Sequence, residues 1–323
     1  MNKDSNLFKE LTDFELRKII TNHFGDNTKF KANLLNGGLF NTTYLIKLLN
    51  TKENFILRVG PINTNLLLPF ELNLMKGEEY VYSLCEDRNI PSSKVLKCDV
   101  SKNLISRDYM IIEYIDSKPL CELKLDKEIE NSLYKETGKY TGKLHQITAN
   151  QFGRVYDVLN GNGFNSWSEF MLNEFQKIKI KLHEYKVFTT EELDCFESII
   201  SDNSQVLDEI KEAHLVHCDL WTGNILVKDY NSKNPKVAAI IDIDRALFGD
   251  IDFDFSNPWI INESFLKGYG IELKDSPEKI IRKNIYRLIY HLIESYVWKV
   301  QYNNPDISDK EKIKALKLIR YFK

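Results

Sequence analysis

The sequence predicts an α+β protein of two lobes, a small lobe built on an antiparallel sheet and a larger, mostly helical lobe. Three observations lead to this prediction. Short segments rich in β-branched and aromatic residues lie between residues 30 and 59 and are separated by turn residues. A nearly continuous apolar run at 109–115, YMIIEYI, ends in turn residues at 116–119. From residue 126 onward, most of the sequence has helical periodicity.

Composition places the chain among ordinary globular proteins. Its 323 residues are 43% hydrophobic and 12% aromatic, which is enough apolar material for two moderate cores. Lys and Arg total 44 and Asp and Glu total 47, so the net charge of -3 gives no general attraction to nucleic acid or to an anionic membrane surface. Any charged ligand must therefore be recognised by a local group of residues.

Cysteine usage and the N-terminal sequence indicate a cytoplasmic protein. The five cysteines are an odd number, lie far apart and form no CxxC pair, so the sequence predicts neither a disulfide framework nor a zinc site. The first residues lack the basic region and apolar run of a signal peptide, and no stretch of about 18 apolar residues occurs. We expect neither export by a signal peptide nor a membrane span.

The first lobe is predicted over residues 1–115 and begins with a helix. Thr12 followed by Glu15 has the pattern of a capping box, and apolar residues recur at helical spacing as far as Gly25, so we expect a helix at about 13–24. Three antiparallel strands joined by tight turns follow, and then a second helix. The predicted ranges are 30–36, 42–49 and 53–59 for the strands and about 71–87 for the helix.

The second lobe is predicted over residues 116–323, because the turn after the apolar run is the best boundary in the chain. Helices are expected at 126–147, 166–185 and 190–213, and two short strands near 225–228 and 237–241. A cleft between two such lobes is a common place for a ligand site.

The strongest local motif is HCDLWTGN at residues 217–224, which lies between the apolar pair Leu215-Val216 and a predicted strand. Asp219 and Asn224 can both project from this loop into the same cleft. Phosphoryl transfer uses such a pair, a carboxylate that orients the attacking hydroxyl and accepts its proton, and a neutral oxygen ligand for Mg²⁺. The alternative interpretation is that both are turn residues between two elements.

A second carboxylate follows shortly downstream. The apolar run at 237–241 has the composition of a buried strand and ends on Asp242. Mg²⁺ keeps several waters, so one carboxylate, one amide oxygen and substrate phosphates suffice to bind it. Asp242 is therefore the expected second metal ligand, and a strand-ending turn residue is the alternative.

Together, LVHCDLWTGNILV and AAIIDIDRALFGDIDFDFS resemble the paired signatures of the aminoglycoside phosphotransferase and choline kinase-like family. The family shows H-G-D-x-x-x-x-N and then I-D-(aromatic)-x-x-(small)-x-x-G-D-P-x-x-D-L. The resemblance covers about residues 30–270 and implies a protein-kinase-like two-lobe fold and a small-molecule kinase activity.

The chain differs from the family pattern at a few positions, and none of the differences removes a reactive group. The differing residues are Cys218 for Gly, Ile243 for the aromatic residue, Ile251 for Pro and Phe255 for Leu. The resemblance implies that Gly249, Asp250 and Asp254 brace the catalytic core without taking part in the chemistry, and that His145 packs or caps at a helix end.

The resemblance also implies a nucleotide site in the first lobe. The hairpin at 36–44, with Gly37, Gly38 and Asn41, would cover the phosphates, and Phe40 stands where the family often has Ser. Arg58 would contact the α and β phosphates from a strand where protein kinases use Lys.

A helix carboxylate and the hinge strand complete the expected nucleotide site. Glu78 is expected to pair with Arg58, with Glu79 as the rival. Glu113 and Ile115 mark the hinge strand, whose main-chain groups would pair with the purine.

The implied reaction is in-line transfer from ATP or GTP to a hydroxyl, with Asp219 as catalytic residue and Mg²⁺ held by Asn224 and Asp242. An aminoglycoside or related antibiotic is the first expected acceptor, because Asp244, Asp252, Glu263 and Glu294 could recognise a cation. Choline, fructosamine, methylthioribose or homoserine are alternatives, and so is a non-catalytic nucleotide-binding module. We expect a monomer or homodimer.

Overall fold

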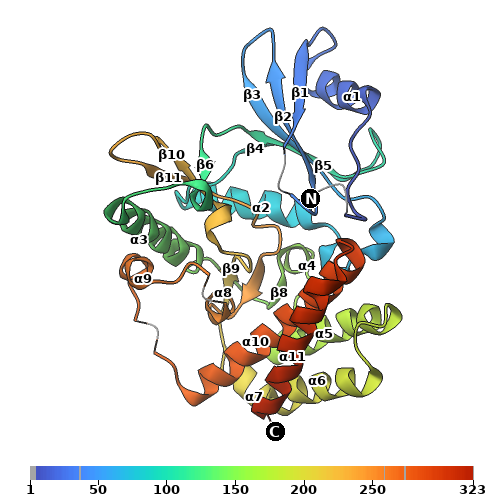
Figure 1. Cartoon of the computed structure of the whole chain (residues 1–323), viewed down its shortest axis with the longest axis vertical. Helices are drawn as coiled ribbons and strands as arrows, with labels where there is room; N and C mark the ends of the chain where they lie inside the picture. The colour runs from blue at the N-terminus through green and yellow to red at the C-terminus, as the bar shows by residue number, and fades with distance from the viewer. Residues whose placement is uncertain (1–4, 36–37, 258, 273, 323) are drawn as a thin grey trace.

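A five-stranded antiparallel sheet forms the N-terminal region of the computed structural model, which describes residues 5–35, 38–257, 259–272 and 274–322 (Figure 1). Its strand order is β1-β2-β3-β5-β4, and every neighbouring pair is antiparallel. The strands are β1 (Phe30–Leu34), β2 (Thr42–Leu48), β3 (Asn54–Val59), β4 (Val95–Asp99) and β5 (Tyr109–Glu113). The strands predicted from the sequence are confirmed, and β4 is an addition to them.

Helices lie beside this sheet. α1 (Asp13–Phe24) begins with the predicted capping box between Thr12 and Glu15 and ends at Gly25, whose φ of 97° favours glycine. The buried residues of α1 share a core with β2 and β3. α2 (Leu74–Asp87) follows two short 3₁₀ turns, η2 (Thr64–Leu66) and η3 (Pro69–Glu71).

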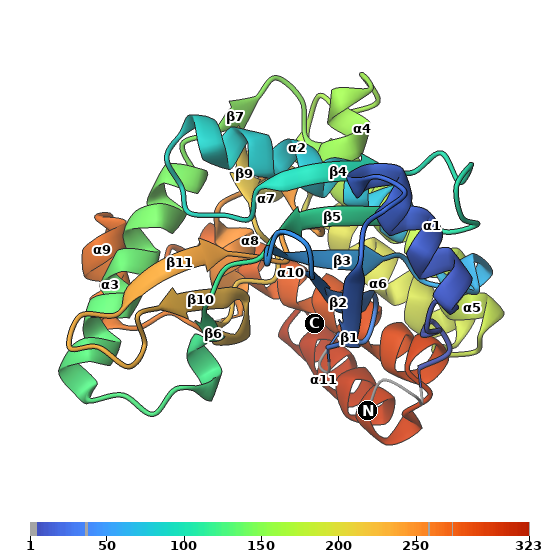
Figure 2. The ribbon, with the colours of Figure 1, turned by 90° about the horizontal axis from the view of Figure 1, so that it is seen from above.

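The C-terminal region is mainly helical, as predicted (Figures 1 and 2). Its longer helices are α3 (Lys127–Leu144), α5 (Trp167–Glu184), α6 (Thr190–Asp202), α10 (Pro277–Tyr296) and α11 (Pro305–Phe322). Its shorter ones are α4 (Val155–Leu159), α7 (Ser204–Leu207), α8 (Asp252–Ser256) and α9 (Glu263–Tyr269), with 3₁₀ turns η4 (Leu120–Glu122) and η5 (Thr222–Asn224) and the π-helix η6 (Val297–Gln301). No helix within the described ranges is long and apolar enough to cross a membrane.

The prediction of one helix over 190–213 was wrong. α6 ends at Asp202 because the Asn203 side chain donates a hydrogen bond of 2.8 Å to the Ile199 carbonyl, which takes up one of the free acceptors at the helix end. The chain then forms the short helix α7 and enters a strand at Ala213.

Two small sheets hold the centre of the C-terminal region. One has the order β11-β10-β6 and the other β7-β9-β12-β8. Their strands are β6 (Lys118–Pro119), β7 (Thr148–Ala149), β8 (Gly153–Arg154), β9 (Ala213–Val216), β10 (Ile225–Lys228), β11 (Lys236–Ile240) and β12 (Leu247–Gly249). The HCDLWTGN loop connects β9 of one sheet to β10 of the other, and Asp242 follows β11, so the topology brings both motifs to one place.

α2 lies between the two regions (Figure 1). Met75 near its start packs with Cys98 and Met110 of the sheet. Val81 and Tyr82 in its second half belong to the large core of the helical region. The lobe boundary between residues 115 and 116 remains a prediction; it falls between β5, which belongs to the five-stranded sheet, and β6, which pairs with β10.

Candidate active site

A buried histidine, His217, holds the loop between β9 and β10 in place. His217 has no exposed surface, and its Nε2 donates to the Ile241 carbonyl at 3.1 Å. Its Nδ1 accepts the Asp219 N–H at 3.2 Å. Burial lowers the pKa of His217, which favours the neutral ring that this donor and acceptor pair needs. The residue that begins the motif therefore positions the backbone of Asp219.

Asp219 lies next to Asn224 at the open side of the loop. The Asn224 side-chain NH₂ donates to the Asp219 carbonyl at 2.8 Å and to its Oδ2 at 3.1 Å. Burial raises the pKa of Asp219 to about 7, against the opposing charge of Arg245 and with a further contribution from Asp242. The carboxyl group is thus poised to exchange a proton near neutral pH, as a general base requires.

The raised pKa of Asp219 predicts a pH-dependent change in stability. A carboxyl group whose folded pKa lies above its unfolded value of 3.8 contributes stability that is present below pH 3.8 and is lost as the pH rises through about 7. Asp219→Asn cannot ionise, so its melting temperature relative to wild type should rise between pH 5 and pH 8. Melting curves of both proteins without nucleotide or metal test this. A difference that stays constant or shrinks over this range would show that the fold does not disfavour the ionised carboxyl.

Asp242 faces Asp219 and Asn224 from the turn after β11. Its backbone has a φ of 60°, and its N–H donates to the Tyr82 hydroxyl at 3.3 Å. The Ile241 N–H donates to the Asn224 carbonyl at 3.0 Å, so the main chain joins the two expected metal ligands. The Asp242 side chain is 45% exposed, which leaves oxygen surface open to a ligand.

Arg58 links the sheet to this turn. Its Nη1 forms an ion pair with the fully buried Glu78 on α2, and its Nη2 binds Asp242 Oδ1 at 3.0 Å. Asp244 Oδ2 lies 3.8 Å from the same Nη2. Glu79, the rival to Glu78, pairs instead with Lys76 at 2.7 Å. Both lobes thus contribute to one charged network, and Glu78 is the residue that meets Arg58.

The hairpin that is expected to cover the phosphates is described only in part, since Gly37 lies outside the described residues. At Gly38 an added Cβ would lie 3.0 Å from the Asn41 carbonyl, which is tight for any larger residue. Asn41 is buried, and its side-chain Oδ1 has no hydrogen-bond partner among the residues described. The contacts of Gly37, Gly38 and Asn41 with a nucleotide remain a prediction.

Glu113 and Ile115 flank the end of β5. The Glu113 N–H donates to the Lys94 carbonyl at 2.9 Å, and the Ile115 carbonyl accepts the Ser117 hydroxyl at 3.0 Å. Because the Glu113 N–H and the Ile115 carbonyl already have these partners, the groups predicted to contact a purine are the Glu113 carbonyl and the Ile115 N–H.

Residues that the sequence reasoning missed lie beside Asp219. Arg245 Nη1 is 3.5 Å from Glu294 Oε1, and its Nη2 is 3.7 Å from Oε1 of the buried Glu71. Arg245 stands three residues after Asp242 in the quoted motif, so a cation near the catalytic carboxylate could have been inferred. No sequence motif around Glu71 predicts that it lies near Arg245, because only the tertiary position of η3 brings it there.

The acidic residues considered for cation recognition are widely separated. Glu294 lies near Asp219 and contributes to raising its pKa. Asp244 faces Arg58, whereas Asp252 pairs with Lys279 at 2.9 Å and Glu263 pairs with Lys267 at 2.7 Å along α9. Glu294 is therefore the carboxylate of this set that adjoins the expected acceptor position.

Two tryptophans, Trp298 and Trp259, lie near that position. Trp298 donates to Glu294 Oε2 at 2.9 Å. Trp259 is 41% exposed and packs edge to face on Tyr290, and both line a small crevice with Cys218 and Leu220. Trp167 is instead fully buried in the helical core.

Residues 31–277 match the sequence model of the phosphotransferase enzyme family, APH. The chain belongs to this family. No curated protein matches it in sequence. Solved structures with the same fold, at a TM-score of 0.64, include APH(2")-IIa in complex with streptomycin and ATP, which is 14% identical and matches over 96% of this chain and 97% of its own. The predicted fold class and phosphotransferase class are confirmed.

Two further solved structures show similar agreement. A candidate fructosamine-3-kinase from Haemophilus somnus is 17% identical with a TM-score of 0.66, over 95% of this chain and 96% of its own. The ethanolamine kinase of Plasmodium vivax is 15% identical with a TM-score of 0.60, over 93% of this chain and 86% of its own. At these identities the likeness shows the fold alone.

Cys218 occupies the glycine position of the family motif. Its φ of 68° lies in the left-handed region that favours glycine. The Cys218 N–H donates to Asp254 Oδ1 at 2.7 Å, and the His217 N–H donates to Asp254 Oδ2 at 2.9 Å. Both oxygens of one carboxylate thus hold the unfavourable backbone in place, as expected for a bracing residue.

His145 supports this carboxylate from the end of α3. It is the C-cap residue of that helix, and its ring Nε2 lies 2.9 Å from Asp254 Oδ2. Its Nδ1 lies 2.8 Å from the Tyr269 hydroxyl. Burial disfavours ionisation of Asp254, but the hydrogen bonds and electrostatic interactions with His145 and His217 together outweigh it and lower the Asp254 pKa.

Gly249 and Asp250 have structural contacts. An added Cβ at Gly249 would lie 2.4 Å from the Trp167 ring, so only glycine fits there. Asp250 Oδ2 accepts the Tyr286 hydroxyl at 2.7 Å and Arg282 Nε at 3.2 Å. These contacts agree with the bracing role that the family pattern implies.

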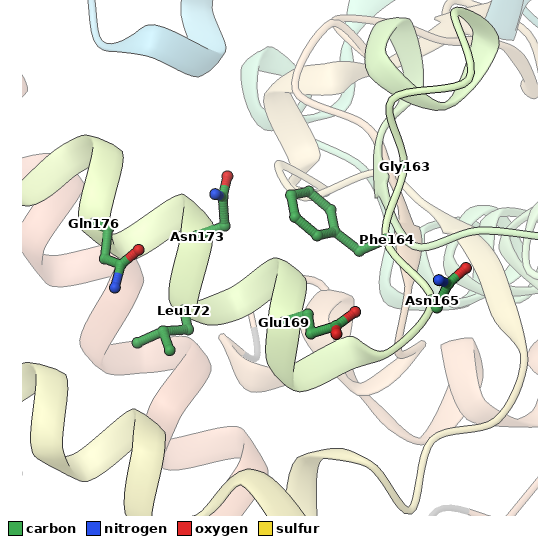
Figure 3. Close-up of a pocket in the computed structure, with 7 residues that line it drawn as sticks. All are labelled: Gly163, Phe164, Asn165, Glu169, Leu172, Asn173 and Gln176. Carbon is green, nitrogen blue, oxygen red and sulfur yellow. The ribbon is translucent and has the colours of Figure 1, made fainter.

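A surface cavity of about 410 Å³ lies away from this network, at the start of α5 (Figure 3). The loop before the helix contributes Phe164, and the first turns contribute Glu169 and Asn173. The cavity is lined by uncharged polar side chains, apolar side chains and one carboxylate, and we assign no function to it.

Proposed function

We propose that the chain transfers the terminal phosphoryl group of ATP or GTP directly to a hydroxyl of a small molecule. One observation carries this proposal, the network that joins Asp219, Asn224, Asp242 and Arg58 across the two lobes. Asp219 would orient the acceptor hydroxyl and accept its proton. Arg58 would exchange its contact with Asp242 for contacts with the phosphates. The complex of APH(2")-IIa with ATP supports a nucleotide as the donor.

Asn224 and Asp242 fit a magnesium ion. Asn224 uses its NH₂ group on Asp219, which leaves its amide oxygen for the metal, and Asp242 offers a half-exposed carboxylate. No group of three or more His, Cys, Asp or Glu side chains in the described ranges is arranged as a metal site. Two protein oxygens together with phosphate oxygens and waters would satisfy Mg²⁺, and the ion would neutralise charge on the phosphates.

An aminoglycoside or related antibiotic is the leading acceptor. Glu294 next to Asp219 supports a cationic group on the acceptor, and the family includes structures bound to streptomycin, gentamicin and kanamycin. A metabolite kinase is the second candidate, because the chain also resembles the ethanolamine kinase of Plasmodium vivax and the candidate fructosamine-3-kinase in fold. A non-catalytic module is disfavoured by the intact Asp219, Asn224 and Asp242.

The test is phosphoryl transfer from ATP and from GTP to a panel of aminoglycosides, other antibiotics, choline, ethanolamine, fructosamines, methylthioribose and homoserine. We expect turnover on at least one acceptor, which disappears in Asp219→Asn. Tight nucleotide binding without turnover on any of them would overturn the proposal in favour of a binding module.

A further inference from the structure

The segment Ser5–Leu7 closes the end of the π-helix η6. The Asn6 N–H donates to the Gln301 carbonyl at 2.8 Å, and the Asn6 side chain donates to the Val300 carbonyl at 2.9 Å. Carbonyls at the end of a helix have no partner within it, so these two need donors from elsewhere. The N-terminal segment supplies them and is thereby attached to the helical lobe, beside its C-terminal helices (Figure 2).

The same segment is also attached to the sheet lobe. Ser5 Oγ lies 3.1 Å from the Leu39 carbonyl and 3.4 Å from the Gln301 carbonyl, and it accepts the Leu7 N–H at 3.2 Å. Leu7 is fully buried, and its carbonyl accepts the Ile62 N–H at 2.9 Å. Ser5, which is 7% exposed, therefore stands between a carbonyl of each lobe.

Leu39 belongs to the hairpin that is expected to cover the phosphates. It follows Gly38 in a bend between β1 and β2. A bend of this kind lies outside the strand ladder, so contacts from outside the sheet help to fix its orientation. The Ser5 hydroxyl provides such a contact, and it comes from a segment that the helical lobe holds.

The attachment point on the helical lobe is connected to the catalytic centre. The Gln301 side chain donates to Glu71 Oε2 at 2.5 Å and to the Leu66 carbonyl at 3.1 Å. Glu71 adjoins Arg245, whose charge acts on Asp219. A chain of contacts therefore runs from the hairpin and the N-terminal segment through Gln301 and Glu71 to Arg245, which acts on the catalytic carboxylate through its charge.

We propose that Ser5 is a positioning residue for phosphoryl transfer, which fixes the phosphate-covering hairpin through the Leu39 carbonyl while Gln301 anchors it to the helical lobe. The proposal rests on the proposed kinase function. A hairpin held in its binding orientation before the nucleotide arrives loses less conformational freedom on binding. Loss of the Ser5 hydroxyl should therefore affect the nucleotide and not the acceptor.

The test compares Ser5→Ala with Asn6→Ala, which removes the side-chain hydrogen bond to Val300 and leaves the contact to Leu39. The dissociation constant of a non-hydrolysable ATP analogue with Mg²⁺ is measured by calorimetry, with melting curves of each variant. We expect Ser5→Ala to raise this constant about three- to tenfold, the range for losing one neutral hydrogen bond, and Asn6→Ala to stay within about twofold of wild type. With an active acceptor, the nucleotide KM should change in parallel and the acceptor KM should not.

Two results would overturn the proposal, and they differ in meaning. If both variants melt lower to a similar extent and bind nucleotide as wild type does, the segment has only a structural role and the kinase function is untouched. If wild type itself fails to bind the nucleotide, the proposed function falls together with the role of Ser5.

Discussion

Asp219→Asn is expected to lower kcat by about 10²–10⁴ while the nucleotide affinity stays nearly unchanged, because Asn keeps the size of Asp but cannot accept a proton. The loss corresponds to roughly 3–5 kcal/mol of transition-state stabilisation. The amide can still take part in the hydrogen bonds with Asn224, so the loop should keep its shape.

Single-turnover rates measured alongside melting curves separate chemistry from product release and from folding. Asp252→Asn is a matched control, since it removes a buried carboxylate whose ion-pair partner is Lys279. Its rate per folded molecule should equal that of wild type. The competing role for Asp219, a turn residue, predicts a lower melting temperature with an ordinary single-turnover rate, and that result would remove the central step of the mechanism.

Asp242→Ala is expected to weaken nucleotide binding in Mg²⁺ by at least about tenfold, because it removes the carboxylate proposed to hold the ion. Without Mg²⁺ the opposite direction is expected. The variant frees Arg58 from a partner at 3.0 Å and removes a negative charge close to the phosphates, so metal-free binding should be equal to or tighter than that of wild type.

Calorimetry with and without Mg²⁺ measures both arms. Asp244→Asn is the matched control, because Asp244 adjoins the same guanidinium at 3.8 Å and the substitution keeps the size of the side chain while removing its charge. It should keep the dependence on Mg²⁺. Equal affinity of Asp242→Ala and wild type in Mg²⁺ would assign the metal to other residues.

The parts of the molecule that the sequence predicted well are those whose information is local. The capping box of α1, the strands near 225–228 and 237–241 and the linear motif around Asp219 each depend on neighbouring residues. Glu78 also followed from helical spacing, because the face of α2 that holds Val81 and Tyr82 is the buried one.

The parts that the sequence did not predict depend on contacts between distant segments. β4 carries only one buried residue, Cys98, so its apolar alternation is too weak to identify a strand. β9 was not predicted, because its four residues gain their partners from β7 and β12, and the predicted helix over 190–213 ran into its first residue. Glu71 and Arg245 are more than 170 residues apart in the sequence, so no short-range sequence pattern predicts their pairing.

The position of α2 has a consequence for how the protein melts. Met75 contributes to the core of the sheet, while Val81, Tyr82 and Cys85 contribute to the core of the helical region. If the sheet unfolded alone, either α2 would leave with it and open the helical core, or α2 would stay and expose its other face to water. Both routes are unfavourable, so the two regions should lose their structure together in one cooperative transition, although each has a core of its own.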